Sequence, residues 1–192
     1  MTDQKFNDIY SEDLAKGAIL NELMFGFKED YLVLHCLLRK YAPKTVFEIG
    51  THIGTGTEII CNAVPRATVY SLDLPVSMAE VSKQHPSEKG EKVGHTCKLK
   101  YNQLYGNSMD FNYAQHPCEA YFIDGEHTEK NVFHETSEIL KLKPKMIIYH
   151  DADMLEVYKG IVEAFIMNDR ICDTRYELYR VTDTRILYAL KQ

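Results

Sequence analysis

The sequence predicts an α/β protein with a doubly wound, mostly parallel sheet and a C-terminal antiparallel hairpin. Three observations lead to this class. Short β-branched, apolar runs alternate with helical patterns along the chain. A glycine-rich turn follows the first of these runs, at the place where doubly wound folds bind their ligands. Two strand-like runs at the end of the chain flank a Thr-Asp pair, which is typical of a hairpin turn.

Length and composition restrict the class of protein further. We expect one domain over residues 1–192, with an arm and helices in 1–41 and the sheet core in 42–192. The net charge of −6 argues against a large nucleic-acid surface. No apolar run reaches the length of a membrane span, and the polar N-terminus lacks a signal-peptide core. The sequence does not decide whether the chain forms a homo-oligomer.

Cysteine usage bears on the compartment. The five cysteines are scattered, odd in number and without a C-x-x-C pair. This pattern fits neither a disulfide framework nor a zinc site. It predicts reduced thiols and a cytoplasmic location.

The N-terminal part is expected to be helical after a loose arm over residues 1–10. Ser11, followed by two acids, predicts a helix start, and Gly26 ends that helix. A second helix is expected over 29–41, and Pro43 stops it. These helices would cover the start of the sheet.

A strand and a glycine-rich turn between Thr45 and Thr57 organise the rest of the chain. The strand is β-branched and aromatic, as buried strands are. It contains Glu48 and leads to Gly50, after which Gly54 and Gly56 open a helix. Glycines let a backbone approach a ligand, and free N–H groups at a helix start point at it. The spacing G-x-x-x-G-x-G differs from the dinucleotide fingerprint, and the Gly-Lys pair of a phosphate loop is absent.

The same patterns predict the remaining elements in order. Further strands are expected over 67–72, 101–105, 118–123, 145–149, 174–181 and 184–190. Further helices are expected over 75–84, 128–142 and 155–168. The lysine-rich segment 85–100 is expected to be a solvated loop.

The acid and the glycines of the turn (Glu48, Gly50, Gly54, Gly56) resemble motif I of the class I S-adenosylmethionine-dependent methyltransferases. That family has a seven-stranded sheet of the predicted kind with an antiparallel final strand. The resemblance implies that these residues and Thr51 bind S-adenosylmethionine. An ordinary strand-to-helix turn in another α/β protein is the alternative.

The resemblance covers about residues 40–190 and implies further cofactor contacts. Asp73 ends the second strand, where a carboxylate can accept hydrogen bonds from both ribose hydroxyls. Asn107 and Ser108 follow the third strand, where the family holds adenine, with a side-chain acceptor for the exocyclic amine and a backbone contact to the ring. Asp124, at the end of the fourth strand, completes the set. A solvated strand-end acid and a plain Gly-Asn turn are the alternatives for Asp73 and Asn107.

Asp124 and Asp151 end strands that are neighbours in this topology. Neighbouring strands lie about 4.8 Å apart, so the two carboxylates can share a hard cation. The Ile-Asp-Gly-Glu-His and His-Asp patterns resemble the metal-dependent O-methyltransferases, namely the catechol and caffeoyl-coenzyme A group and, more closely, the bacterial sugar and macrolide enzymes. The resemblance implies a Mg²⁺ site, with Asp153 as its third ligand. Capping of neighbouring helices is the alternative.

A general base is expected beside these acids. The catechol group has a lysine three positions after the fourth-strand aspartate, and here that position is His127. A histidine can accept a proton near neutral pH, and His150 is the second candidate. The sequence thus predicts metal-assisted O-methylation of a small hydroxylated acceptor. A metal-independent methyltransferase and a non-catalytic protein with the same fold are the alternatives, whereas the glycine spacing disfavours a nicotinamide dehydrogenase.

Overall fold

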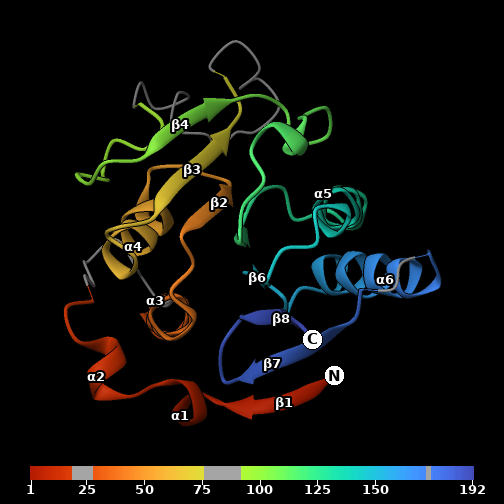
Figure 1. Ribbon diagram of the computed structural model, residues 1–192, viewed down its shortest axis with the longest axis horizontal. Coiled ribbons are helices and arrows are strands. Elements are labelled where there is room, and N and C mark those ends of the chain that lie inside the picture. Colours follow the sequence, from red (N-terminus) through yellow and green to blue (C-terminus); the bar gives the residue numbers. More distant parts are fainter. Residues whose placement is uncertain (19–27, 76–91, 172–173) are drawn as a thin grey trace.

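A single sheet forms the centre of the protein, which we analysed as a computed structural model. The structure describes residues 1–18, 28–75, 92–171 and 174–192. Within them, eight strands pair in the order β1-β7-β8-β6-β5-β2-β3-β4. Figure 1 shows this sheet with helices on both sides. The predicted fold class, a mostly parallel doubly wound sheet, is confirmed.

Five parallel strands make up one side and the middle of the sheet, as predicted. They are β2 (Thr45–Ile49), β3 (Thr68–Asp73), β4 (Asn102–Tyr105), β5 (Ala120–Ile123) and β6 (Met146–Tyr149). The expected hairpin follows as β7 (Tyr176–Thr182) and β8 (Leu187–Lys191). Strand β8 runs antiparallel to both β6 and β7.

The N-terminal arm contributes an eighth strand, so the expectation of a loose arm was wrong. Strand β1 (Thr2–Lys5) pairs in parallel with β7. The short helices α1 (Phe6–Ile9) and α2 (Glu12–Ala15) follow it. The sheet therefore does not begin at residue 42. Strand β1 is polar and mostly exposed, so it carries no alternating apolar pattern from which a strand could be predicted.

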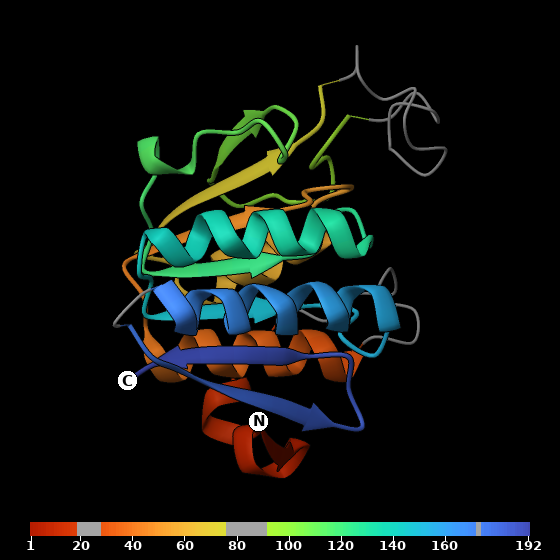
Figure 2. The ribbon, with the colours of Figure 1, turned by 90° about the vertical axis from the view of Figure 1, so that its right-hand side faces the viewer.

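Helices cover both faces of the sheet. One face carries α3 (Lys28–Tyr41) and α4 (Thr55–Ala63). On the other face, α5 (Glu129–Lys141) and α6 (Leu155–Ile171) lie side by side (Figure 2). Successive residues of β5 point to opposite faces. Accordingly, Phe122 packs into the core with α3 and α4, and Tyr121 into the core with α5 and α6.

Two expected features lie outside the described residues. These are residues 19–26 of the helix expected to end at Gly26 and nearly all of the helix expected over 75–84. The helix that begins after Ser11 already ends at Ala15, so the expectation of one continuous helix up to Gly26 was wrong. Among the described residues, no helix is both long and apolar enough to cross a membrane.

The strand order reverses at β2, which pairs with β3 on one side and β5 on the other. Ile49 at the end of β2 faces Leu72 in one ladder and Ile123 in the other. The carboxyl ends of these three strands are therefore level. Doubly wound sheets bind their ligands in the crevice at such a switch point, and the predicted site residues lie at the ends of these strands and of their neighbours β4 and β6.

Candidate functional site

The glycines of the turn after β2 approach other parts of the protein closely. Gly50 has a φ of +97°, and a Cβ built on it would lie 2.0 Å from the carbonyl oxygen of Asp124. Gly54 has a φ of +100°, and its Cβ would lie 2.9 Å from the backbone of a neighbouring loop. A Cβ on Gly56 would lie 2.6 Å from Oε1 of Glu48. Packing within the protein thus requires all three glycines. Their spacing in the sequence does not distinguish this packing role from contact with a ligand.

Glu48 lies beneath this turn and is fully buried. Its Oε2 accepts hydrogen bonds of 2.5 Å from the hydroxyls of Thr57 and Ser71. Thr51 Oγ1 lies 2.6 Å from Ser71 Oγ and accepts a bond from Gln103 Nε2. Burial raises the pKa of Glu48 to about 8, although the two hydroxyls counteract it. The side chains of Glu48 and Thr51 therefore shape the turn from inside the protein.

The loop over residues 94–98 packs on the outer side of the same turn. Gly94 N donates to His52 O at 2.8 Å, and Thr96 N donates to Ile53 O at 2.9 Å. This part of the segment is therefore attached to the turn, and the expectation of a solvated loop holds there only for its exposed residues His95 and Lys98.

Asp73 ends β3 beside the glycine turn, where the sequence predicts a ribose contact. Its Oδ2 accepts a hydrogen bond of 2.6 Å from His52 N, and its Oδ1 accepts one of 2.7 Å from Leu74 N. Gly50 N donates to Leu72 O at 2.9 Å, which keeps the turn and the end of β3 together. The half-buried Asp73 carboxylate is thus fixed at the rim of the switch point.

Asn107 and Ser108 lie in the loop after β4. The side-chain oxygen of Asn107 accepts a hydrogen bond of 3.0 Å from Met109 N. The carbonyl oxygen of Ser108 accepts one of 3.0 Å from the Tyr113 hydroxyl. The loop is thus held by its own contacts, and the amide oxygen of Asn107 accepts one bond within it and keeps a second lone pair.

Asp124, His127 and Asp151 meet at the rim of the sheet. One ligand atom from each lies within 4.8 Å of the others. His127 Nε2 is 3.6 Å from Asp124 Oδ1 and 3.2 Å from Asp151 Oδ2. The pairing of Ile123 with Tyr149 aligns the ends of β5 and β6 and so places the two carboxylates together. This group has the composition and spacing of a cation site.

His150 lies between three carboxylates and is 6% exposed. Its Nδ1 is 3.2 Å from Asp124 Oδ1 and 3.1 Å from Asp151 Oδ2, and its Nε2 is 3.1 Å from Asp30 Oδ2. Burial lowers the pKa of His150, but the neighbouring carboxylates outweigh this and raise it to about 12. The imidazolium therefore compensates the charge of the acids, and both its nitrogens are engaged.

The two rim acids are ionised at neutral pH. Burial raises the pKa of Asp124 and of Asp151, but in each case the charge and hydrogen bonds of His150 and other partners outweigh it, so both pKa values are lowered. The neighbouring carboxylate of Asp124 raises the pKa of His127. Asp151 has a φ of +51°, a backbone conformation that is uncommon outside glycine and is often found at functional sites.

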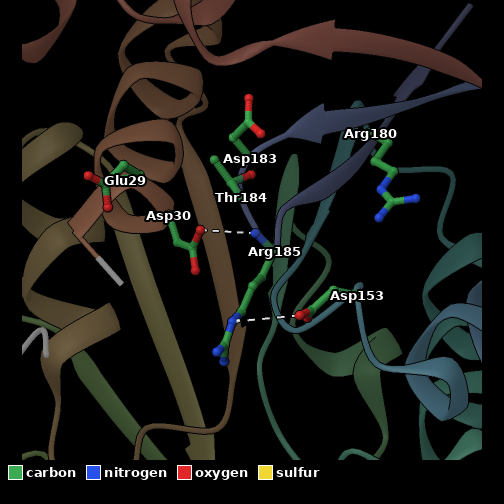
Figure 3. Close-up of a pocket in the computed structure, with 7 residues that line it drawn as sticks. All are labelled: Glu29, Asp30, Asp153, Arg180, Asp183, Thr184 and Arg185. Atoms are coloured by element: carbon green, nitrogen blue, oxygen red, sulfur yellow. Dashed lines mark hydrogen bonds and ion pairs between the residues drawn. The ribbon is translucent and has the colours of Figure 1, made fainter. Parts of the chain in front are cut away.

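Asp153, the expected third metal ligand, points to a different partner. Arg185, between β7 and β8, places its Nε 3.8 Å from Asp153 Oδ2 and its Nη1 2.9 Å from Asp151 Oδ1. Figure 3 shows the guanidinium reaching toward Asp153. The structure thus brings His127, and not Asp153, into the group with Asp124 and Asp151.

A polar cavity of about 340 Å³ adjoins this group (Figure 3). Its lining is entirely polar or charged and consists of Glu29, Asp30, Asp153, Arg180, Asp183, Thr184 and Arg185. Asp30 contacts His150 and Arg185 contacts Asp151, so the cavity shares a wall with the acid group. Of the predicted site residues, Asp153 lines it, whereas the predicted cofactor residues do not.

Sequence reasoning missed Asp30 and Arg185. Asp30 lies in the first turn of α3, 120 residues before His150. Arg185 N donates to Asp30 Oδ1 across 155 residues of sequence. No local motif could indicate these residues, because every partner that gives them a role is distant along the chain.

No protein-family model and no curated protein matches this sequence. Solved structures do match its fold. The S-adenosylhomocysteine-bound methyltransferase PaMTH1 of Podospora anserina has a TM-score of 0.58 at 12% identity, covering 86% of this chain and 79% of that chain. The O-methyltransferase TomG of Streptomyces achromogenes, in complex with S-adenosylmethionine, has a TM-score of 0.56 at 18% identity, covering 95% and 91%.

A third match holds a metal ion. The MycE methyltransferase of the mycinamycin pathway, in complex with Mg, S-adenosylhomocysteine and mycinamycin VI, has a TM-score of 0.54 at 16% identity. The alignment covers 81% of this chain and 47% of that chain. At these identities the matches show that the protein shares the fold of these methyltransferases.

Proposed function

We propose that this protein is an S-adenosylmethionine-dependent O-methyltransferase that acts on a small hydroxylated acceptor with the help of a divalent cation. One relationship carries the proposal. The carbonyl of Asp124 packs against Gly50 of the turn, while the side chain of Asp124 belongs to the group with His127 and Asp151. The turn that would hold a nucleoside and the group that would hold a cation are therefore contiguous, as metal-assisted methyl transfer requires.

The residues at the switch point fit the cofactor. Asp73 stands at the end of β3 with a half-buried carboxylate for the ribose. Asn107 and Ser108 would frame the adenine. The turn at Gly50 and Gly54 would hold the amino-acid end. S-adenosylmethionine supplies a methyl group that its sulfonium has already activated. The ligands in the PaMTH1 and TomG structures support this assignment.

The carboxylates of Asp124 and Asp151 would hold the cation. Mg²⁺ is commonly bound through one or two carboxylates and keeps several water ligands, so the pairing of Asp153 with Arg185 does not conflict with this assignment. A cation bound there polarises the acceptor hydroxyl and lowers its pKa. Arg185 and His150 orient the two carboxylates through the contacts described above.

His127 is the base in this proposal. Its side chain is 38% exposed and its Nε2 faces both rim carboxylates, so it can take the proton of a hydroxyl held between them. His150 is less suited, because both its nitrogens contact carboxylates and the side chain is buried. In the transfer, the bond between sulfur and the methyl carbon breaks and a bond between oxygen and that carbon forms. His127 keeps the released proton.

The polar cavity beside the acids would admit the acceptor. Its charged lining favours a hydrophilic, hydroxylated molecule over an apolar one, because burying these groups against an apolar surface would leave them without partners. The acceptor in the MycE complex, mycinamycin VI, belongs to that protein. For this protein the proposal names only the hydroxylated class.

Calorimetric titration with S-adenosylmethionine, with and without Mg²⁺, tests the cofactor. Binding in the micromolar range is expected, and an absence of heat in both conditions would overturn the proposal. A panel of sugars, polyols and catechols, monitored for S-adenosylhomocysteine release, tests the reaction. Full activity in excess chelator would favour the metal-independent alternative, in which the partly exposed His127 acts without a cation.

A further inference from the structure

Two cysteines lie close together outside the candidate site, and the proposed function uses neither. Cys61 is on α4, and Cys97 is in the loop over residues 94–98. Both are free thiols. The Sγ of Cys61 lies 3.7 Å from the carbonyl oxygen of Lys100, and the Sγ of Cys97 lies 3.7 Å from that of Leu99, the preceding residue. Both sulfurs therefore contact the same short segment, and the two thiols interact electrostatically.

Backbone contacts on either side of Cys97 hold it beside α4. Before it, Thr96 donates to the carbonyl oxygen of Ile53 through both its N, at 2.9 Å, and its Oγ1, at 2.8 Å. After it, Lys98 N lies 3.5 Å from Oε1 of Glu58 on α4. A disulfide requires two cysteines whose backbones are held a short distance apart, and these contacts hold the loop in that position.

The two thiols differ in exposure. Cys61 is 5% exposed. Cys97 is half-buried, and of the four cysteines that the structure describes it is the only one that is not buried. A small oxidant that arrives from solvent therefore meets Cys97 first and has little access to Cys61.

The surroundings of Cys97 favour its thiolate. The neighbouring Cys61 thiol lowers the pKa of Cys97, Lys98 adds to this effect, and together they outweigh burial and the charge of Glu58. Burial instead raises the pKa of Cys118 to about 11. The thiolate is the form of cysteine that peroxides oxidise. Cys97 thus combines access with reactivity, and a second thiol lies beside it.

We propose that Cys97 is a site of peroxide oxidation and that Cys61 converts the product to a reversible disulfide. In the first step the Cys97 thiolate attacks one oxygen of hydrogen peroxide, the O–O bond breaks, and a sulfenic acid and hydroxide form. In the second step the Cys61 sulfur attacks the Cys97 sulfur, the S–O bond breaks, and the hydroxide leaves as water with the proton of Cys61. Two electrons pass from the two sulfurs to the peroxide.

The first step prepares the second. Foremost among its causes, the interaction with Cys97 raises the pKa of Cys61. A sulfenic acid carries no charge at neutral pH, so oxidation of Cys97 removes this effect of a thiolate and makes Cys61 easier to deprotonate. The resulting disulfide would join the loop covalently to α4, the helix that begins at the glycine turn.

Mass spectrometry of peptides from peroxide-treated protein tests the proposal. Reduced protein is treated with hydrogen peroxide, its remaining thiols are alkylated, and it is digested. The wild type and the control Cys118→Ser should both yield two peptides joined through Cys61 and Cys97, two hydrogens lighter than the separate peptides. Dithiothreitol should separate them. In the wild type, Cys97 should be oxidised at least about tenfold faster than Cys118.

Two variants separate the roles of the two thiols. Cys61→Ser should accumulate a sulfenic acid at Cys97, which dimedone traps, and should form no link. Cys97→Ser should form neither product. Because a disulfide restricts the unfolded chain, the oxidised wild type should melt at least about 4 °C above the reduced protein. Oxidation should raise the melting temperature of neither variant.

Three results would overturn the inference: a wild type that forms no link between Cys61 and Cys97, a link from Cys97 to another cysteine instead, or a Cys97 that is no more reactive than Cys118. None of these measurements requires S-adenosylmethionine or a cation. Their failure would therefore leave the proposed function intact, and a failure of the proposed function would leave this inference intact.

Discussion

His150 Nε2 lies 3.1 Å from Asp30 Oδ2, and both side chains are buried. Asp30 also accepts a hydrogen bond from the backbone of Arg185. One carboxylate on α3 therefore joins the end of β6 to the last hairpin. Since His150 and Arg185 both contact Asp151, Asp30 fixes the geometry of the acid group without belonging to it.

Replacement of Asp30 should destabilise the fold. Asp30→Ala leaves a buried imidazolium without one of its carboxylates, and breaking a buried charge pair costs about 3–5 kcal/mol. Asp153→Ala is the matched control, because Asp153 is 47% exposed and its contact with Arg185 is long at 3.8 Å. Its effect should stay within about 1 kcal/mol. Urea unfolding measures the loss of unfolding free energy in both variants. Equal losses would contradict the structural role assigned to Asp30.

Gly50→Ala should cost more than Gly17→Ala. Both glycines have positive φ values, +97° and +81°, so both substitutions carry the left-handed backbone penalty of about 1–2 kcal/mol. Nothing lies within 4 Å of a Cβ on Gly17, whereas one on Gly50 would meet the Asp124 carbonyl. Overpacking adds about 1–3 kcal/mol. Thermal unfolding of the two variants should reveal this difference, and similar melting temperatures would show that the turn can relax.

Glu48 should make stability depend on pH. Its pKa rises from 4.5 to about 8 on folding, so between these values the folded chain keeps a proton that the unfolded chain has lost. Stability contributed by Glu48 therefore falls as pH increases across this window, by up to about 1.4 kcal/mol per unit. The glutamine side chain of the Glu48→Gln variant does not titrate, so the variant lacks this contribution to the pH dependence.

Unfolding free energies of the wild type and Glu48→Gln, measured at several pH values, test this expectation. The unfolding free energy of the variant, relative to that of the wild type, should increase as pH rises from 4.5 to about 8. A constant difference across that range would mean that the glutamate ionises normally in the fold.

The proposed cation site makes separate predictions for three acids. Asp124→Asn and Asp151→Asn each remove a carboxylate from the group and should weaken Mg²⁺ binding by at least about tenfold. Asp153→Asn should leave it nearly unchanged. Titration of the free protein with Mg²⁺ gives the three affinities. The opposite order, with Asp153→Asn the most impaired, would place the third ligand where the sequence predicted it.

The parallel half of the sheet could be predicted from sequence because its signals are local. The run at β2 is β-branched, and the glycines after it mark the turn. Strand β1 escaped prediction because its residues are polar and its partner β7 is distant. The sequence shows an acid at position 153, close to Asp151. Only the fold shows that this acid pairs with Arg185. Such pairings depend on contacts between residues that are distant in the sequence, so local spacing cannot predict them.

Because Thr2 pairs with Tyr179, β1 can join its neighbour only after the chain has been synthesised beyond Tyr179. Contacts at such separation close slowly, whereas β2 and β3 lie close together in sequence. Until β1 arrives, the outer edge of β7 is open, and open strand edges pair with other molecules. We therefore expect chaperone demand and aggregation during synthesis to respond to changes in residues 2–5, which lie in none of the sites described above.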